Sequence, residues 1–399
     1  MKEGWEYKKL GDCFISINNG ANIRQVKGAK GIPVTRIETL SNDKFNRERM
    51  GYADILDASP YSSYILNDGD ILMSHINSMK FLGRAVQYSK KENETIIHGM
   101  NLLRLVPTKD VLSSFLVYQF YTAFFRNQIV SISHQSVNQA SFNTTNLKNL
   151  KLKVPPLSEQ QSIVDYLDSA FAKIDAMKAN AEKALNEAKA LFQASLKEML
   201  EPKEGWEEKK LGDLATDMYR GSGIRRDQVT KEGTPCVRYG EIYTTYNVGF
   251  DTCVSHTKEE YISSPKYFEH GDLLFAITGE SVEDIGKTIA YLGNEKCLCG
   301  GDIICMKHNQ NPKFLAYALT TPEAIRQKGM GKTKLKVVHT NAPALKGIII
   351  PVPPLSVQQS IVETLDSLKS KVDRLQENYD KISQECDALK QAILRQVFE

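Results

Sequence analysis

The sequence has no long hydrophobic run and few cysteines, and both shortages exclude classes of protein. No apolar segment approaches the roughly 20 residues that a membrane-spanning helix needs, and the opening residues MKEGWEYKKLGD lack the apolar stretch of a secretion signal. Seven cysteines at irregular spacing in 399 residues fit reduced thiols better than a disulfide framework. We therefore expect a cytoplasmic protein that makes no contact with a membrane.

Complete catalytic motifs are also missing. Gly331–Thr333 matches the end of a phosphate-binding loop, but Arg326 stands where that loop requires its first glycine. Asn311–Phe314 departs from the Asn-Pro-Pro-aromatic signature of amino-methyltransferases, because its third residue is lysine. We find no convincing glycine-rich cofactor loop at the end of a strand. The sequence therefore predicts a chain without a catalytic, cofactor-binding or metal site.

The segment Cys297–His308 contains three cysteines and a histidine, which raises the possibility of zinc. Its cysteines lack the paired C-x₂-C spacing of structural zinc sites, and they alternate as in a strand, which points neighbours to opposite faces. The corresponding stretch of the first half, IIHGMNLLRLVP, contains no cysteine. We expect core thiols here rather than metal ligands.

The sequence does contain a long internal repeat. KEGWEYKKLGD at Lys2–Asp12 returns as KEGWEEKKLGD at Lys203–Asp213, and VPPLSEQQSIVDYLD at Val154–Asp168 returns as VPPLSVQQSIVETLD at Val352–Asp366. A period near 200 residues is far above the 20–50 residues of solenoid repeats. We therefore expect a duplicated domain with the helix that follows it, divided as 1–157, 158–200, 201–355 and 356–399.

Each Val-Pro-Pro-Leu-Ser phrase predicts the start of a long helix. Ser158 and Ser356 are favourable N-caps, and Gln161 and Gln359 complete a Ser-x-x-Gln capping box. Neither glycine nor proline interrupts residues 158–200 or 356–399. Each helix is therefore expected to extend roughly 64 Å at about 1.5 Å per residue.

Apolar residues recur along both helices at alternating steps of four and three, which is the period of a coiled coil. The second helix has a bulky seam of Ile361, Leu365, Leu368, Val372, Leu375, Tyr379, Ile382, Cys386, Leu389 and Ile393. The same frame in the first helix gives smaller residues, namely Ile163, Leu167, Ala170, Ile174, Met177, Ala181, Ala184, Ala188, Leu191 and Ser195. A bulky seam fills space well against a small one, so we expect the helices to pair with each other. The alternative is a surface helix on each domain.

The stretches 1–157 and 201–355 mix short β-branched or aromatic runs with Gly, Asn and Asp turns. Each has one helical patch, near Val111–Ile129 and Pro312–Lys328, so we expect α+β domains. Residues 1–157 hold 20 basic and 13 acidic residues, a net charge of +7, whereas residues 201–355 hold 20 of each. Arg326–Lys346 nevertheless contains six basic residues and no acid. Such local excess suits phosphate binding, and a solvated basic face is the alternative.

These features together resemble the DNA-specificity subunit of type I restriction–modification enzymes. Two variable domains, each introduced by EGW-x-x-KKLGD and closed by VPPL-S-x-QQSIV-x-x-LD running into a long helix, span the whole chain. The resemblance implies an α+β fold with two target-recognition domains, separated and joined by two long antiparallel coiled-coil helices with pseudo-twofold symmetry. Each domain would read one half of a bipartite sequence in double-stranded DNA, and the helices would dock methyltransferase subunits.

The resemblance also implies that this chain is not an enzyme. Partner modification subunits would carry S-adenosylmethionine and methylate adenine, and restriction and translocase subunits would carry ATP hydrolysis, Mg²⁺ and cleavage. Two other classes stay open on the residues alone. One is a coiled-coil scaffold that binds only proteins, and the other is a nuclease or methyltransferase in its own right.

Loops of both domains supply candidate DNA contacts. They are Asn18–Arg24, His75–Arg84 and Ser133–Asn143 in the first domain, and Tyr219–Arg226 and Gly331–Asn341 in the second. Arginine can read guanine through two hydrogen bonds, and glutamine or asparagine can read adenine in the same way; the plain alternative for each is a turn or surface side chain. The candidate residues are Asn22, Arg24, Lys80, Arg84, Gln135, Asn138, Gln139, Arg220, Arg225, Arg226, Lys332, Lys334 and Lys336.

Overall fold

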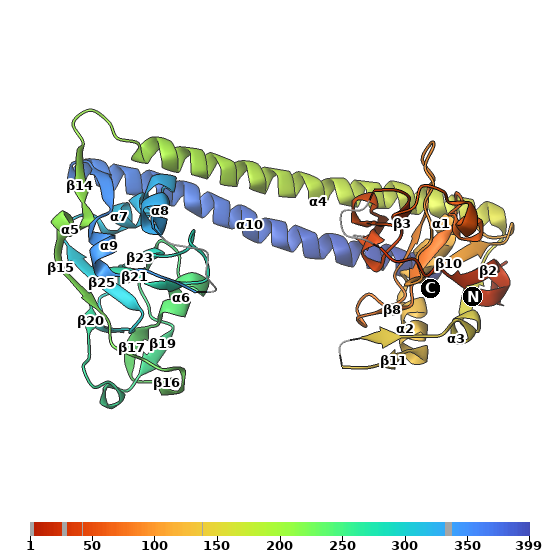
Figure 1. Ribbon diagram of the computed structural model, residues 1–399, viewed down its shortest axis with the longest axis horizontal. Coiled ribbons are helices and arrows are strands. Elements are labelled where there is room, and N and C mark those ends of the chain that lie inside the picture. The colour runs from red at the N-terminus through yellow and green to blue at the C-terminus, as the bar shows by residue number, and fades with distance from the viewer. Residues whose placement is uncertain (1–3, 26–29, 42, 138, 332–336) are drawn as a thin grey trace. The chain divides into compact units, whose positions relative to one another are not determined.

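The computed structural model describes residues 4–25, 30–41, 43–137, 139–331 and 337–399. The chain divides into two compact units (Figure 1). Unit 1 comprises Met1–Ala181 and Tyr379–Glu399, and unit 2 comprises Glu182–Asn378. Each unit contains one α+β domain and part of two long helices, α4 (Leu157–Leu200) and α10 (Leu355–Phe398). Among the described residues, no helix has an apolar stretch long enough to cross a bilayer.

The domain of unit 1 is built on an antiparallel sheet with the strand order β2-β10-β7-β9. Alternate side chains of this sheet enter different cores: Ile71 and Met73 face helices, whereas Leu72 packs with Leu66 and Tyr88. The sheet is therefore buried on both faces. Its strands and the helices that cover it are β2 (Phe14–Asn19), β10 (Leu102–Pro107), β7 (Ile71–Ser74), β9 (Ala85–Gln87), α1 (Ser113–Phe120) and α2 (Ala123–Ile132).

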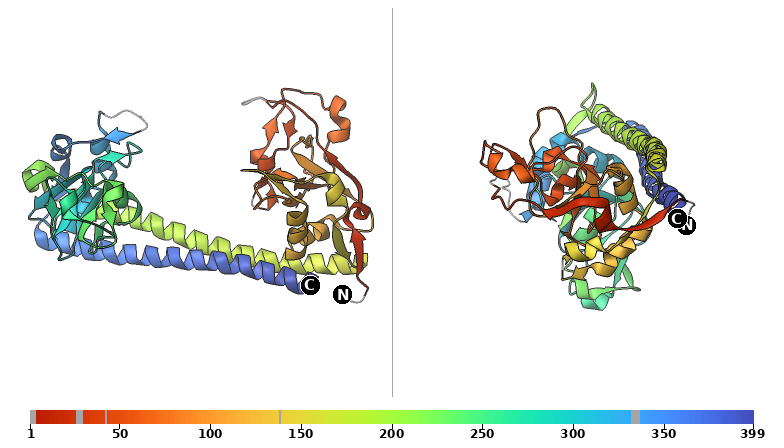
Figure 2. Two further views of the ribbon diagram at one scale, coloured as in Figure 1. Left: turned by 90° about the horizontal axis from the view of Figure 1, so that it is seen from below. Right: turned by 90° about the vertical axis from the view of Figure 1, so that its right-hand side faces the viewer.

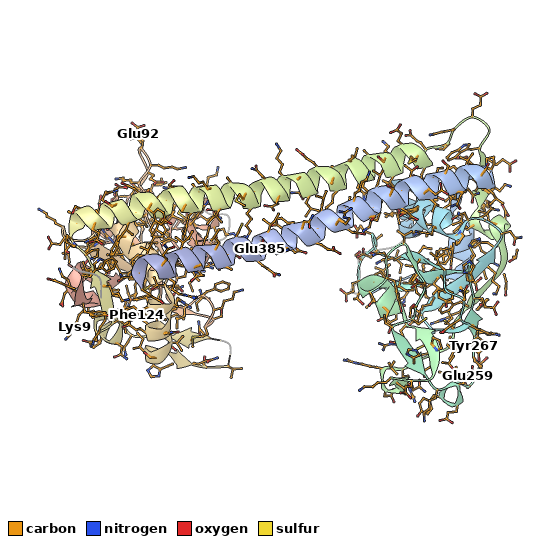
Figure 3. The ribbon with its side chains drawn as sticks, turned by 180° about the vertical axis from the view of Figure 1, so that it is seen from behind. Lys9, Glu92, Phe124, Glu259, Tyr267 and Glu385 are labelled. Carbon is orange, nitrogen blue, oxygen red and sulfur yellow. The ribbon has the colours of Figure 1, made fainter. Side chains whose placement is uncertain are left out.

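Smaller elements complete unit 1. Phe124 of α2 packs on Tyr7 of β1, with ring centroids 6.4 Å apart; Figure 3 labels Phe124 and Lys9 at the end of β1. The pairs are β1 (Glu6–Lys9) with β13 (Lys151–Val154), β3 (Pro33–Val34) with β6 (Gly51–Tyr52), and β4 (Leu40–Ser41) with β5 (Lys44–Phe45). A further sheet joins β11 (His134–Gln135), β12 (Ala140–Ser141) and β8 (Ile76–Asn77). The short helices are α3 (Thr144–Lys148), η1 (Leu10–Cys13), η2 (Ile37–Thr39), η3 (Arg47–Arg49) and η4 (Ser59–Tyr64).

Unit 2 repeats this plan with a larger second layer. Its central sheet has the order β15-β25-β21-β23-β18, and a second five-stranded sheet has the order β16-β19-β17-β24-β20. In Figure 3 Tyr267 of β20 lies beside Glu259, to which its hydroxyl donates a hydrogen bond. The strands of the central sheet are β15 (Ala215–Arg220), β25 (Ile303–His308), β21 (Leu273–Ala276), β23 (Thr288–Tyr291) and β18 (Gly249–Phe250). Those of the second are β16 (Val229–Thr230), β19 (Ser255–Thr257), β17 (Thr234–Val237), β24 (Cys297–Cys299) and β20 (Tyr267–Phe268).

The remaining elements of unit 2 correspond to those of unit 1. The pair of β14 (Glu207–Lys210) with β27 (Ile349–Val352) matches β1 with β13, and β22 (Thr278–Gly279) with β26 (Val338–His339) matches β8 with β12. The helices are α5 (Leu211–Leu214), α6 (Tyr239–Thr244), α7 (Pro312–Ala318), α8 (Pro322–Gly329), α9 (Ala342–Lys346), η5 (Arg226–Gln228) and η6 (Glu259–Tyr261). All seven cysteines are buried free thiols, as expected for core positions.

Each expected helical patch consists of two short helices rather than one. α1 ends before Thr122, whose side chain accepts a hydrogen bond from Phe125 N and caps α2. α7 ends before Thr321, which caps α8 in the same way through Ala324 N. A threonine cap satisfies a backbone donor at the start of a new helix. The break therefore has the same local cause in both copies.

The repeated Leu-Ser-x-Gln-Gln phrase acts through a different glutamine from the one expected. α4 and α10 begin at Leu157 and Leu355, one residue before the serines that were expected to cap them. Gln160 is fully buried: its Oε1 accepts from Leu112 N at 2.9 Å, and its Nε2 donates to the carbonyls of Asp110 (3.0 Å) and Pro155 (2.9 Å).

Gln358 is the copy of Gln160 in unit 2 and is also fully buried. Its Oε1 accepts from Asn311 N at 3.0 Å, and its Nε2 donates to Gln310 Oε1 and Pro353 O, both at 2.8 Å. Gln161 and Gln359 are exposed and donate to acids one turn later on their own helices, and Gln359 Oε1 also accepts from Asn311 Nδ2 at 2.8 Å. The first glutamine of each pair thus fastens the long helix to its domain.

Gln160→Ala is expected to destabilise unit 1 by about 2–4 kcal/mol. The substitution leaves the buried carbonyl of Pro155 without its partner, which costs about 1–3 kcal/mol, and removes two part-buried hydrogen bonds, from Leu112 N and to Asp110 O, which contribute about 0.5–1.5 kcal/mol each before relaxation. Urea unfolding monitored through Trp5, which is buried in unit 1, in a Trp206→Phe background measures the loss. Gln161→Ala is the matched control and should change stability by less than about 0.5 kcal/mol. Equal effects of both substitutions would contradict this role of Gln160.

In each unit α4 and α10 lie side by side and run antiparallel (Figure 2). In unit 1 Lys178 Nζ lies 3.4 Å from Asp387 Oδ1, and Lys390 Nζ lies 2.5 Å from Asp175 Oδ1. The residue number therefore falls along α10 as it rises along α4. In unit 2 Lys189 donates to Gln376 Oε1 at 2.8 Å. The coiled-coil pairing thus includes polar contacts at the edges of the apolar seam.

The buried face of α4 differs from the expected seam. Met177 and Leu191 are 59% and 60% exposed, and Ala184 is exposed as well, whereas Leu185 is 3% exposed. The face that packs comprises Val164, Leu167, Phe171, Ile174, Lys178, Ala181, Leu185, Ala188, Phe192, Leu196 and Leu200. Between Leu167 and Phe192 it follows steps of four and three in the opposite order to the expectation, and steps of four lead on to Leu196 and Leu200. This order places Phe171, Leu185 and Phe192 on the packed face, where the expected seam had Ala170, Ala184 and Leu191.

The buried face of α10 follows the expected seam for most of its length. Ile361, Leu365 and Val372 are buried, and Leu368, Leu375, Tyr379, Ile382 and Ile393 are half-buried, as is Ile163 of α4. Leu389 is 47% exposed. The next residue, Lys390, packs against α4 instead. Its Nζ lies 5.2 Å from the ring centroid of Phe171 and also forms the ion pair with Asp175.

Candidate nucleic-acid interface

The three predicted loops of the first domain meet at one edge of its central sheet. β2 ends at Asn19 and β7 at Ser74, whereas β10 and β9 begin at Leu102 and Ala85. Because neighbouring strands are antiparallel, all four points lie on the same edge. The loops 20–24 and 75–84 therefore leave the sheet together.

The β11–β12 hairpin joins this edge through β8. Ala140 pairs with Asn77 and Ser141 with Ile76, and Phe142 N donates to His75 O at 3.2 Å. The loop His75–Arg84 and the segment Ser133–Asn143, which lie far apart in the sequence, thus form one surface. Figure 1 shows β8 and β11 close together beside α2.

Most candidate side chains of unit 1 are exposed to solvent and can reach DNA. Asn22, Arg24, Lys80, Gln135 and Gln139 are exposed on these loops. Asn138 lies outside the described residues. Exposed polar and basic side chains on one surface can contact phosphates and base edges.

Arg84 is already engaged within its own domain. Its Nε lies 3.2 Å from Asp43 Oδ1, its NH1 donates to Leu40 O at 3.3 Å, and its guanidinium lies 4.5 Å from the ring centroid of Phe81. Reading a guanine would require Arg84 to leave all three partners. The structure therefore gives this residue a role in ordering the loop.

Arg126 on α2 was missed by sequence reasoning and holds the same loop. Its guanidinium donates to the carbonyls of Leu82, Met79 (3.3 Å) and Lys80 (3.4 Å). Burial lowers its pKa from the usual value, but arginine stays charged at any physiological pH. A lone charge on the helix that carries Phe124, Phe125 and Ile129 was the available signal, because a charge beside buried apolar residues must find acceptors.

The second domain brings its loops to the corresponding edge. β15 ends at Arg220 and β21 at Ala276, whereas β25 and β23 begin at Ile303 and Thr288. Thr278 of β22 pairs with His339 of β26, and Thr278 Oγ1 lies 3.1 Å from His339 Nδ1. This pairing ties the segment after β21 to the Gly331–Asn341 segment, as in unit 1.

The candidate arginines of unit 2 differ in whether they already form an ion pair. Arg220 forms an ion pair with Asp302 at 2.8 Å, Arg225 lies 3.6 Å from Asp227, and Arg226 is exposed. Lys332, Lys334 and Lys336 lie outside the described residues. Within the described part of the chain, Arg24, Lys80 and Arg226 are the candidate cations that have no ion pair. Since exposed ion pairs are weak, Arg220 and Arg225 can still exchange their partners for a phosphate.

Comparison with protein families agrees with this arrangement of two similar domains. The family model described as "Type I restriction modification DNA specificity domain" matches residues 2–187 and again residues 203–384. The chain therefore belongs to the family of type I restriction-modification DNA specificity domains, and it contains two of them.

Curated relatives and solved structures resemble the chain over most of its length. A "Putative type I restriction enzyme MjaX specificity subunit" of Methanocaldococcus jannaschii is 29% identical over 396 residues, covering 94% of this chain and 88% of that protein. The StySPI specificity subunit of Salmonella potsdam is 24% identical over 322 residues, covering 74% and 66%.

Two solved structures show the same fold. A chain from a study of "complex assembly and conformational transition of the type I R-M system" has a TM-score of 0.72 at 18% identity and covers 100% of this chain and 98% of its own. The HsdS subunit of Thermoanaerobacter tengcongensis has a TM-score of 0.55 at 18% identity, with coverage of 100% and 97%.

Proposed function

We propose that this chain is the specificity subunit of a type I restriction–modification system and reads a bipartite target in double-stranded DNA, one half per domain. The observation that carries the proposal is the duplication of one interface: in both domains the same loops leave the same edge of the central sheet. In this role the chain directs methyltransferase and restriction–translocase subunits to its target in the cytoplasm. S-adenosylmethionine, ATP and Mg²⁺ belong to those partners, and this chain binds no cofactor.

The exposed side chains of the two domains can contact both the DNA backbone and the edges of the bases. Exposed Lys80 can neutralise a phosphate, which gives binding that weakens with salt, whereas exposed Arg24 and Arg226 can each pair with a guanine through two hydrogen bonds. Exposed Asn22, Gln135 and Gln139 have the side-chain amides that pair with adenine edges. Arg126 and Arg84 hold the loop 75–84 in place, which lowers the entropy lost on binding.

Selection from a pool of random duplexes by the full chain with its methyltransferase partner tests the proposal. The expected result is two conserved sequence blocks separated by an unspecified spacer, with retention that falls as salt rises. Arg24→Ala should relax the block read by the first domain only, and Arg226→Ala the block read by the second, each by about tenfold or less in preference.

If the complex retained no duplex at any salt concentration, the proposal would be wrong, and the chain would be a scaffold that binds only proteins. Incubation of the chain alone with DNA, Mg²⁺ and S-adenosylmethionine tests the other alternative, a nuclease or methyltransferase in its own right. We expect neither cleavage nor methyl transfer, and either product would contradict a specificity subunit without catalysis of its own.

A further inference from the structure

The tip of the β11–β12 hairpin carries an apolar side chain between two exposed glutamines. Val137 is 96% exposed, the highest value among the exposed large hydrophobic residues of the described chain. Gln135 and Gln139 are exposed on either side of it. Single exposed apolar residues are common, so the position of Val137 has to be judged by its surroundings.

Hydrogen bonds close the hairpin between Ser136 and Gln139, on either side of Val137. Ser136 donates to Gln139 O through both its backbone N at 2.7 Å and its Oγ at 2.9 Å. At the base of the hairpin, Ala140 is 1% exposed and Phe142 is 4% exposed. The ribbon is therefore anchored in the core of unit 1, while its tip reaches solvent.

The chemistry of the tip matches one kind of base pair. The major groove admits a two-stranded β-ribbon, and there an A·T pair shows the N6 and N7 of adenine and the C5 methyl of thymine. Glutamine pairs with that adenine edge, and an apolar side chain contacts that methyl. The segment 133–143 contains no acidic residue, so no like charge opposes its approach to phosphates.

We infer that the β11–β12 hairpin enters the major groove and that Val137 contacts the C5 methyl of a thymine. Val137 is then a specificity-determining residue, and the neighbouring Gln135 and Gln139 read the adenine edge of the same or the adjacent pair. Lys80, on the loop that follows β8, is placed to bind a phosphate beside the groove. This assignment rests on the proposed function and adds the base that the hairpin selects.

Deoxyuridine scanning of the target tests the assignment, because deoxyuridine differs from thymidine only by the missing methyl group. Each thymine of the selected target is replaced in turn, and binding by the full chain with its methyltransferase partner is measured. We expect one position in the first domain's half to weaken binding by about threefold to fivefold, the effect of one buried methyl group. Val137→Ala should bind the thymine and deoxyuridine duplexes equally well.

Leu56→Ala is the matched control, since Leu56 is also exposed in unit 1, at 91%, and lies outside the hairpin. It should keep the response to deoxyuridine. A first half-site without a thymine, a target that responds at no thymine of that half, or a response that persists in Val137→Ala would each overturn the assignment. Loss of sequence-specific binding by the unmodified chain on every duplex would instead overturn the proposed function.

Discussion

Lys328→Ile is expected to stabilise unit 2 at pH 7 by on the order of 2 kcal/mol. Lys328 on α8 is 6% exposed, and burial lowers the pKa of its ammonium from 10.5 to about 7. Each pKa unit corresponds to about 1.4 kcal/mol of cost to the charged form. Its Nζ donates to Leu319 O at 2.8 Å and lies 3.3 Å from Thr288 Oγ1. The substitution leaves the carbonyl of Leu319 without its donor, which costs about 1–3 kcal/mol of stability and reduces the net gain.

The first domain has isoleucine at the corresponding position. Gly83 and Gly286 have nearly the same backbone angle, with φ of 73° and 72°. A Cβ on Gly83 would lie 3.1 Å from Ile129 Cγ1, and one on Gly286 would lie 3.2 Å from Lys328 Cδ. Ile129 thus occupies in unit 1 the place that Lys328 occupies in unit 2. The site therefore accepts isoleucine in one copy of the fold.

The pH dependence gives the clearest readout. Between pH 7 and 10.5 the unfolded chain keeps a proton on Lys328 that the folded chain has released. Unfolding then takes up a proton, so the contribution of Lys328 to stability rises with pH across this window. Below pH 7 both states are protonated, and the cost of the buried charge is present in full. Lys328→Ile should abolish this rise, with its largest stabilisation below pH 7.

Urea unfolding between pH 6.5 and 9.5 measures the effect. Trp5 and Trp206 are the two tryptophans of the chain, so a Trp5→Phe background leaves Trp206 as the reporter of unit 2. Lys346→Ile removes an exposed lysine of the same unit and should keep the pH profile of the parent. Parallel profiles for Lys328→Ile and the parent would show that Lys328 does not titrate in this range.

The helices and the duplication could be predicted from the sequence because both are written locally. The Pro-Pro pair marks where a helix cannot continue backward, and neither glycine nor proline follows it before the end of α4 at Leu200. The sequence could not decide in the same way which residues of α4 form the buried seam. Steps of four and three fit Ala170 and Ala184 as well as Phe171 and Leu185, because both frames share Leu167. Contacts outside the helix decide between them: Phe171 packs on Tyr118 of α1, and Phe192 packs on Tyr317 of α7.

Strand pairing and the joining of loops depend on contacts that no local pattern contains. β2 pairs with β10, and β8 with β12, although several other strands and helices separate the members of each pair along the chain. Composition could identify the candidate loops but not their internal partners. Arg84 is bound by Asp43, which lies in another loop, so its residue type suggested a base contact that its surroundings oppose.

Phe398→Ala is expected to destabilise unit 1 by about 3 kcal/mol, the lower part of the range for removing a buried phenyl ring. Phe398 is 3% exposed, and its ring centroid lies 5.4 Å from that of Phe115 and 6.2 Å from that of Trp5. Its carbonyl also accepts a hydrogen bond from Lys153 Nζ at 2.7 Å. The last turn of α10 therefore completes the core of the first domain, although α10 begins against the second.

Leu200→Ala is the matched change in unit 2. Leu200 is the last residue of α4, as Phe398 is the last of α10, and with Leu196 it enters the core of the second domain. We expect a loss of about 2–3 kcal/mol. Each loss should appear in one unit: Phe398→Ala in the unfolding seen by Trp5 in a Trp206→Phe background, and Leu200→Ala in that seen by Trp206 in a Trp5→Phe background.

The crossed pattern of effects separates two ways in which the helices can contribute to stability. If each helix end belongs to the core it enters, a loss of about 3 kcal/mol lowers the midpoint of thermal unfolding of that unit by about 6–12 °C and leaves the other unit unchanged. If both units unfold as one cooperative block, both reporters shift together after either substitution. A shift in both reporters would therefore contradict the assignment of Phe398 to unit 1 alone, because the stability it supplies would be shared along the whole helix pair.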